Sequence, residues 1–131
     1  MLLMVICMKA ISTPVTAESF CSLDREIAGL MDAWTGLSVP GTGRGLLSAQ
    51  VAILRAEAAY SSALDCRSEN LPEEVDLYWQ KYMKASADCI FNCREAFREP
   101  DAVNSAELLS ASFTRWETSG EDFLNSVQST R

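Results

Sequence analysis

Residues 70–98 read NLPEEVDLYWQKYMKASADCIFNCREAFR, and this stretch decides the fold that we expect. Its apolar residues recur three and four positions apart, which is the spacing of one side of an α-helix. They form two stripes, Val75, Tyr78, Tyr82, Ala85 and Cys89 in one and Trp79, Met83, Ile90, Cys93 and Phe97 in the other. A helix that is apolar on more than one side contacts more than one neighbour. We therefore expect this helix to be the most buried of the molecule.

The start of this helix carries several favourable signals. Asn70 followed by Glu73 resembles a capping box, and Pro72 is tolerated in a first helical turn. Acidic residues gather near this start, while Arg94 and Arg98 lie near the end, so both groups suit the helix dipole. We predict a helix that begins just after Asn70 and ends near Arg98.

Three further segments show helical periodicity, at about residues 17–35, 46–67 and 101–128. The apolar stripe of the first is Phe20, Leu23, Ile27, Leu30 and Trp34. The stripe of the second is Leu47, Val51, Leu54 and Ala58, widened by Ile53, Tyr60 and Leu64. The stripe of the last is Ala102, Ala106, Leu109, Phe113, Trp116, Gly120, Phe123 and Val127. We expect all of these stripes to face a shared core, with at least two of the three tryptophans mostly buried.

The connections between the helices set the expected architecture. They are short, and the sequence has no alternating strand pattern and no Asn-Gly or Asp-Gly hairpin turn. Short connections favour antiparallel neighbours. We predict an all-α fold, an antiparallel up-down-up-down four-helix bundle, with one domain at residues 17–131 after a tail or signal segment at residues 1–16.

The N-terminal segment leaves the localisation open. Leu2–Met8 is an apolar run that is too short to span a bilayer. It resembles the core of a signal peptide with a small-residue cleavage site at residues 15–17, but no Lys or Arg precedes it and Lys9 interrupts it. A tail, or a true start at Met8, is the alternative. We expect a cytoplasmic chain, or a secreted or periplasmic one if residues 1–17 are cleaved.

Composition excludes several classes of function. The chain has 131 residues, 48% of them apolar, with no His and a net charge of −7. The lack of His removes Ser-His-Asp and Cys-His nucleophile systems and the usual His-ligated zinc, haem and di-iron sites. The negative charge argues against nucleic acid as a partner, because Lys and Arg drive that binding. We expect no enzyme activity, no bound cofactor, no metal and no transmembrane segment.

The cysteines suggest two arrangements. Cys21 and Cys66 fall at the same end of adjacent helices, so they are the expected disulfide pair in an oxidising compartment. Cys89 and Cys93 share a helix face at about the level of Met31, which gives a thiol and thioether cluster that would suit a soft metal ion. Burial of all three in the core is the simpler interpretation.

A glycine-rich loop precedes the second helix. It contains Gly41, Gly43, Arg44 and Gly45, but it follows no strand and does not end in Gly-Lys-Ser/Thr, as a phosphate-binding loop would. We expect an interhelical loop that could contact a partner.

Protein binding is the function that these features favour. A small acidic bundle without a catalytic constellation is typical of an adaptor, a chaperone-like protein or an inhibitor or immunity-type protein. The partner is another protein, and self-association into a homo-oligomer is left open. One alternative is a structural subunit of a larger assembly. The other is a bundle that holds an apolar ligand or a soft metal in a space lined by Trp34, Trp79, Met83 and Trp116.

Overall fold

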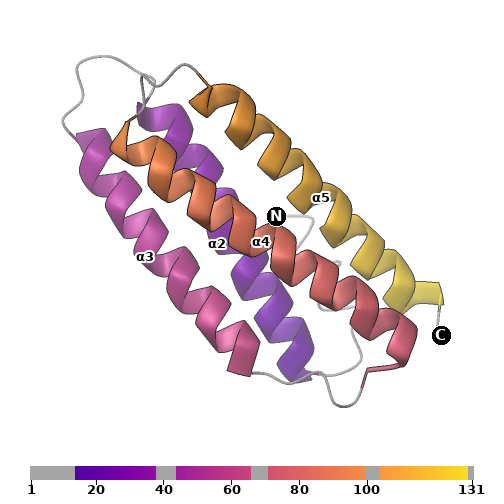
Figure 1. Ribbon diagram of the computed structural model, residues 1–131. Helices are drawn as coiled ribbons and strands as arrows, with labels where there is room; N and C mark the ends of the chain where they lie inside the picture. Colours follow the sequence, from indigo (N-terminus) through magenta and orange to yellow (C-terminus); the bar gives the residue numbers. More distant parts are fainter. Residues whose placement is uncertain (1–13, 38–43, 66–70, 100–103, 130–131) are drawn as a thin grey trace.

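Four helices make up the part of the protein that the structure describes. The computed structural model describes residues 14–37, 44–65, 71–99 and 104–129, and all that follows concerns these residues. The helices are α2 (Pro14–Leu37), α3 (Arg44–Asp65), α4 (Glu73–Arg98) and α5 (Ser105–Ser129) (Figure 1). Helices account for 96% of the described residues, and none of those residues lies in a strand. The all-α prediction is confirmed.

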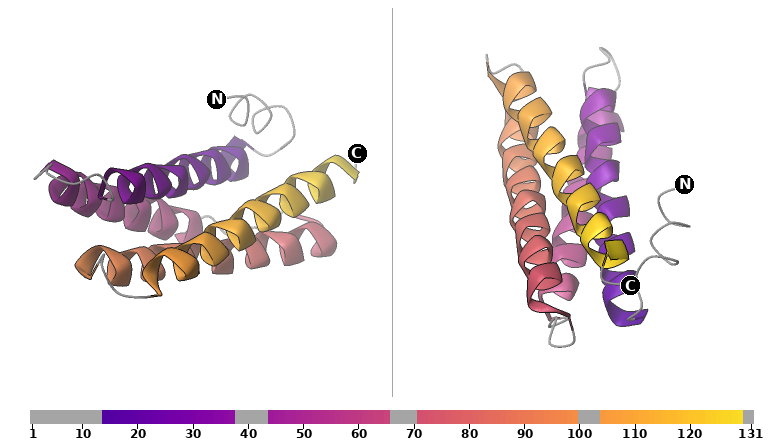
Figure 2. Two further views of the ribbon diagram at one scale, coloured as in Figure 1. Left: turned by 90° about the horizontal axis from the view of Figure 1, so that it is seen from above. Right: turned by 90° about the vertical axis from the view of Figure 1, so that its right-hand side faces the viewer.

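The helices pack together in two pairs. The most extensive contacts join α4 to α5 and α2 to α3, and α4 also packs against both α2 and α3 (Figures 1 and 2). This packing is compatible with the predicted up-down-up-down bundle. Within the described ranges, no helix combines the length and the apolar character that crossing a membrane would require.

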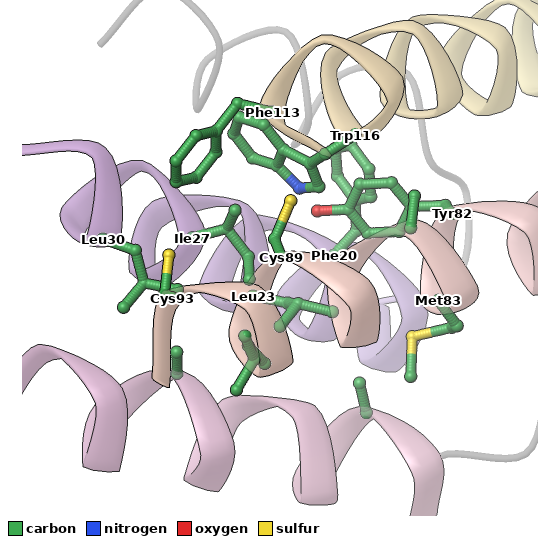
Figure 3. Close-up of a cluster of buried hydrophobic side chains, with 14 of the residues drawn as sticks. Phe20, Leu23, Ile27, Leu30, Tyr82, Met83, Cys89, Cys93, Phe113 and Trp116 are labelled. Atoms are coloured by element: carbon green, nitrogen blue, oxygen red, sulfur yellow. The ribbon is translucent and has the colours of Figure 1, made fainter. Parts of the chain in front are cut away.

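The core follows the predicted stripes of three of the four helices. In α2, Phe20, Leu23, Ile27 and Leu30 are fully buried (Figure 3). Both stripes of α4 are buried apart from the half-buried Tyr78, which confirms that this helix has more than one packed side. In α5 the stripe from Leu109 to Val127 is buried, but Ala106 is exposed.

Aromatic rings connect α2, α4 and α5 at the centre of the core. The Phe20 ring lies 4.7 Å from Tyr82 and 5.2 Å from Phe123, and the Trp79 ring lies 5.1 Å from Phe123, measured between centroids. Tilted rings at such distances attract beyond the area that they bury. Trp79 and Trp116 are buried and Trp34 is half-buried, so the prediction of at least two buried tryptophans is confirmed.

The main stripe predicted for α3 is wrong, although Ile53 and Tyr60, two of the residues expected to widen it, do pack against the core. Leu47, Val51 and Leu54 remain 66%, 42% and 66% exposed, and Ala58 is exposed as well. The helix instead packs through a different row, the fully buried Ala49, Ala56 and Ala63. These three lie seven residues apart, on the side of the helix opposite to Leu54. Small side chains let α3 approach its neighbours closely, and this turns its large apolar residues outward.

Two helix starts also differ from the prediction. The N-cap residue of α4 is Pro72, which makes no side-chain cap, so the predicted capping box is not formed; Asn70 lies outside the described residues. The Pro72 carbonyl accepts a hydrogen bond from the backbone N–H of Asp76 at 2.8 Å. Helix α2 begins at Pro14 rather than Ala17, so residues 15–17 form part of its first turn. Proline is favoured at that position because its missing N–H would have no helical partner.

Two glycines give a matched test of this packing. A methyl group at Gly120 would lie 3.3 Å from Cε1 of the fully buried Tyr82, whereas one at Gly29 meets no atom within 4 Å. We expect Gly29→Ala to stabilise the protein by about 1 kcal/mol, because Ala is the better helix former. We expect Gly120→Ala to bring no gain or a net loss, since rings on several sides hold Tyr82 in place. Urea denaturation measures both, and an equal gain at the two sites would contradict the packing described.

Candidate functional site

The exposed row on α3 is the most conspicuous surface feature of the molecule. We call Leu47, Val51, Leu54 and Ala58 the α3 seam. Its first three members are among the seven large apolar side chains that are exposed in the described residues; the others are Leu64, Leu77, Phe91 and Leu108. The spacing of the seam is four, three and four, so its members form one continuous row along the helix. An exposed apolar row of this kind marks an interaction surface more often than an isolated exposed leucine does.

A groove runs along one side of the seam, between α2 and α3. It has a volume of about 750 Å³. The residues that line it from α3 are Leu47, Ser48, Val51, Ala52 and Arg55, and those from α2 are Glu26, Gly29, Asp32, Ala33 and Gly36. The α2 wall is low because three of its five residues are Gly or Ala. Large side chains from a docking partner could therefore lie between the two helices.

A second groove runs along the other side of the seam, between α3 and α4. It has a volume of about 520 Å³, and Gln50, Ile53, Leu54, Glu57, Arg94, Phe97 and Arg98 line it. The apolar residues Ile53 and Phe97 pack against the core. Trp34 supports Phe97 from behind, with the two rings stacked at 6.0 Å between centroids and 6° between planes. This groove has a firm apolar floor and charged rims.

The two grooves carry opposite charges on their outer walls. The α2 wall has the carboxylates of Glu26 and Asp32, and the α4 wall has the guanidinium groups of Arg94 and Arg98. From α3 itself, Arg55 lines the first groove and Glu57 lines the second, where Glu57 pairs with Arg94 at 3.6 Å. The lining therefore has three acidic and three basic residues. The surface around the seam is neutral in a chain whose net charge is −7.

A second candidate lies inside the bundle, where a carboxyl group is buried. The Tyr82 hydroxyl donates a hydrogen bond to Oδ1 of Asp24 at 3.1 Å, and both side chains are buried. Burial raises the pKa of Asp24 to about 6, against the hydrogen bond from Tyr82, which lowers it, and the charge of Glu117 raises it further. Burial also raises the pKa of Tyr82 well above its usual value. The indole N–H of Trp116 is turned toward the Tyr82 hydroxyl, an interaction that lowers the pKa of Tyr82 against the larger effect of burial (Figure 3).

The two thiols of α4 lie in the same core. Cys89 and Cys93 are fully buried, and the Cys89 thiol donates a hydrogen bond to the backbone carbonyl of Ser112 at 3.2 Å. Burial raises the pKa of each thiol to about 12. A thiol must lose its proton to act as a nucleophile or as a metal ligand, so both groups are held in their unreactive form at neutral pH. This chemistry favours a packing role.

The structure brings together only part of the residues singled out in the sequence. Cys89 and Cys93 are buried, and Met31 is partly buried against the same core. No group of three or more Cys, His, Asp or Glu in the described part of the chain could hold a metal ion. Cys66, Gly41 and Gly43 lie outside the described residues, and Arg44 and Gly45 begin α3. Hence the Cys21–Cys66 disulfide and the partner-binding role of the loop stay predictions.

Sequence reasoning found the members of the seam but assigned them to the core. The signal that points the other way is the row Ala49, Ala56 and Ala63, which offers α3 a second face at heptad spacing. Asp24 was missed because it follows Leu23 in the sequence and looks like a surface residue of α2.

Comparison with known proteins adds no constraint on this site. No protein family, no curated protein and no solved structure matches the chain.

Proposed function

We propose that the protein is a non-enzymatic protein-binding bundle that docks its partner on the α3 seam and the two grooves beside it. The observation that carries this proposal is the exposure of Leu47 and Leu54, each 66% exposed, in one continuous row. Because the fully buried residues of α3 are all alanines, Leu47, Val51 and Leu54 are left available to another molecule.

The shape and the chemistry of the surface support a protein as the partner. Helices pack against each other by fitting ridges of side chains into grooves, and the α3 seam is such a ridge between two grooves. The centre is apolar and the rims are charged, which is the usual arrangement in protein interfaces. The raised pKa of both buried thiols and the lack of His leave few groups for catalysis at neutral pH.

An apolar ligand held between the helices has less support. The residues expected to line such a space were Trp34, Trp79, Met83 and Trp116. None of these four lines either groove, and Trp79, Met83 and Trp116 are buried in the packed core.

Two surface substitutions test the proposal. Leu47→Glu and Leu54→Glu place charges on the seam, where both native side chains are exposed, so helix content and unfolding midpoint should stay close to those of the parent. We expect the double variant to lose the proteins that co-purify with the tagged parent chain from its native cells. Quantitative mass spectrometry of the purified material measures this loss.

The matched control is Leu108→Glu. Leu108 is 46% exposed on α5 and borders neither groove, so its change alters surface charge without touching the seam. The control should keep the same set of bound proteins. Equal retention by the seam variant and by the control would show that the α3 seam is not the docking surface.

A further inference from the structure

We infer that the partner on the α3 seam is a second copy of this chain, paired in parallel and in register as a short two-stranded coiled coil. This inference rests on the proposed function, and it names the molecule that occupies the surface. Spacing, residue type, charge and the placement of the grooves each contribute to it.

The seam has the heptad pattern of a dimeric coiled coil. Val51 and Ala58 take the a positions, and Leu47 and Leu54 take the d positions. A β-branched residue at a with Leu at d favours two parallel strands. In the same frame Ala49, Ala56 and Ala63 all occupy position f, on the side opposite the seam, and all three are buried against the bundle. One face of α3 therefore packs inward and the opposite face has the composition of a dimer seam.

The charges on the groove walls select the parallel orientation. When two copies meet face to face with α3 parallel to α3, the α2 side of each copy lies opposite the α4 side of the other. Glu26 and Asp32 of one copy then face Arg94 and Arg98 of the second. An antiparallel pair would set α2 against α2 and α4 against α4, so that like charges would face each other. Glu26 and Arg98 also pair within their own chain, with Arg25 at 3.4 Å and Glu95 at 3.6 Å. Of the two orientations, only the parallel one adds opposite charges across the interface.

The acidic and basic walls also lie at matching heights. The groove beside α2 extends along α3 from Leu47 to Arg55, and the groove beside α4 extends from Gln50 to Glu57. In a parallel pair in register, each height on one α3 meets the same height on the other. The acidic wall of one copy therefore overlaps in height with the basic wall of the second.

The bundle removes the usual obstacle to such a short coiled coil. From Leu47 to Ala58 the seam rises only about 16 Å, which is too short for isolated peptides to pair, because the helix itself would have to form. Here α3 is already folded against α2 and α4. Only the association itself has to be stabilised, and the apolar floors of the two grooves can add contacts to those of the seam.

Light scattering coupled to size-exclusion chromatography tests the proposal. The full chain should give twice the mass of one chain at micromolar concentration and dissociate on dilution. Leu54→Glu sets two carboxylates face to face, so we expect its dissociation constant to rise by about 30-fold or more. Leu108→Glu, the control on α5, should remain dimeric. A parent chain that stays monomeric, or a dimer that survives Leu54→Glu, would overturn the proposal.

Cysteine cross-linking tests the orientation. Leu47→Cys and Ala58→Cys, introduced singly at the two ends of the seam, should each give a covalent dimer under mild oxidation that the parent chain does not give. In a parallel pair each residue meets its own counterpart, whereas in an antiparallel pair residue 47 meets the other end of the seam. Absence of self-cross-linking at both ends, in a chain that is dimeric by light scattering, would overturn the parallel arrangement.

A charge reversal provides an independent readout. Arg94→Glu with Arg98→Glu should weaken the dimer, and adding Glu26→Arg with Asp32→Arg in the same chain should restore it. Failure of this rescue would contradict the charge argument.

If the chain is monomeric throughout but the seam variant still loses a different co-purifying protein, the second-copy proposal fails while the proposed function stands. If neither measurement responds to Leu54→Glu, both fail.

Discussion

Replacing Trp116 by Ala should lower the free energy of unfolding by roughly 3–5 kcal/mol. Trp116 is 5% exposed, and its ring meets Phe113 edge-on at 6.4 Å between centroids. Removing the indole leaves a space next to Tyr82 and Cys89 that these neighbours cannot fill (Figure 3). A loss of this size is a large share of the stability of an ordinary domain. Urea denaturation followed by far-ultraviolet circular dichroism measures it.

Trp116→Phe is the control for this prediction. It keeps most of the ring volume and removes the buried indole N–H, which is turned toward the Tyr82 hydroxyl (Figure 3). The phenyl ring fills most of the space that Ala would leave empty, so the cost of the cavity is smaller. We expect Trp116→Phe to cost less than half as much as Trp116→Ala. Parental stability in the Ala variant would show that this side chain does not belong to the core.

Asp24→Asn should stabilise the protein at pH 8 and leave it nearly unchanged at pH 4. The pKa of Asp24 is raised from 3.8 to about 6 in the folded chain, so the folded state binds a proton more tightly than the unfolded state. The resulting stabilisation is fully present below about pH 4 and is lost as the pH rises through about 6. Because the pKa of Asp24 is about two units higher in the folded than in the unfolded chain, ionising this group above pH 6 lowers the free energy of unfolding by about 3 kcal/mol.

The amide of the variant has no charge to bury and can still accept the hydrogen bond from Tyr82. We therefore expect a gain of about 2 kcal/mol at pH 8, measured as the difference in unfolding free energy between Asp24→Asn and the parent chain. Taking this difference at each pH cancels the titration of the other carboxyl groups. The same difference at pH 4 and pH 8 would mean that the pKa of Asp24 is the same in the folded and unfolded states, and hence that burial does not raise it.

The sequence predicted α4 well because both of its apolar stripes are long and both face neighbours. The sequence predicted the wrong buried face for α3, because hydrophobic spacing identifies an apolar face of a helix but not what that face contacts. Leu47, Val51 and Leu54 are the more apolar row, so periodicity assigns them to the core. The alanine row is chosen instead because it lets α2 and α4 come close. The alanine row is visible in the sequence at heptad spacing, but the choice between the two rows depends on how three helices fit together.

The buried carboxyl group of Asp24 shows the same limit of prediction from sequence, here at a single residue. Asp24 is enclosed by Tyr82, which lies 58 positions away in the sequence, and it lies near Gly120. A Gly inside an otherwise apolar helical stripe was visible in the sequence, and it read only as a weak helix former. In the structure it is the position where a side chain would collide with Tyr82. The partners of Asp24 become evident only when α2, α4 and α5 are assembled.

The reactivity of the Cys89 and Cys93 thiols measures how often the core opens. Both thiols are fully buried, and the pKa of each is raised to about 12, so neither reacts with an alkylating reagent while the bundle is closed. Their alkylation rate, followed by mass spectrometry of the single peptide that contains both, therefore measures how often the core around α4 opens. Joint modification of the two sites would identify this opening as one cooperative event, and stepwise modification would reveal local fluctuations within the core.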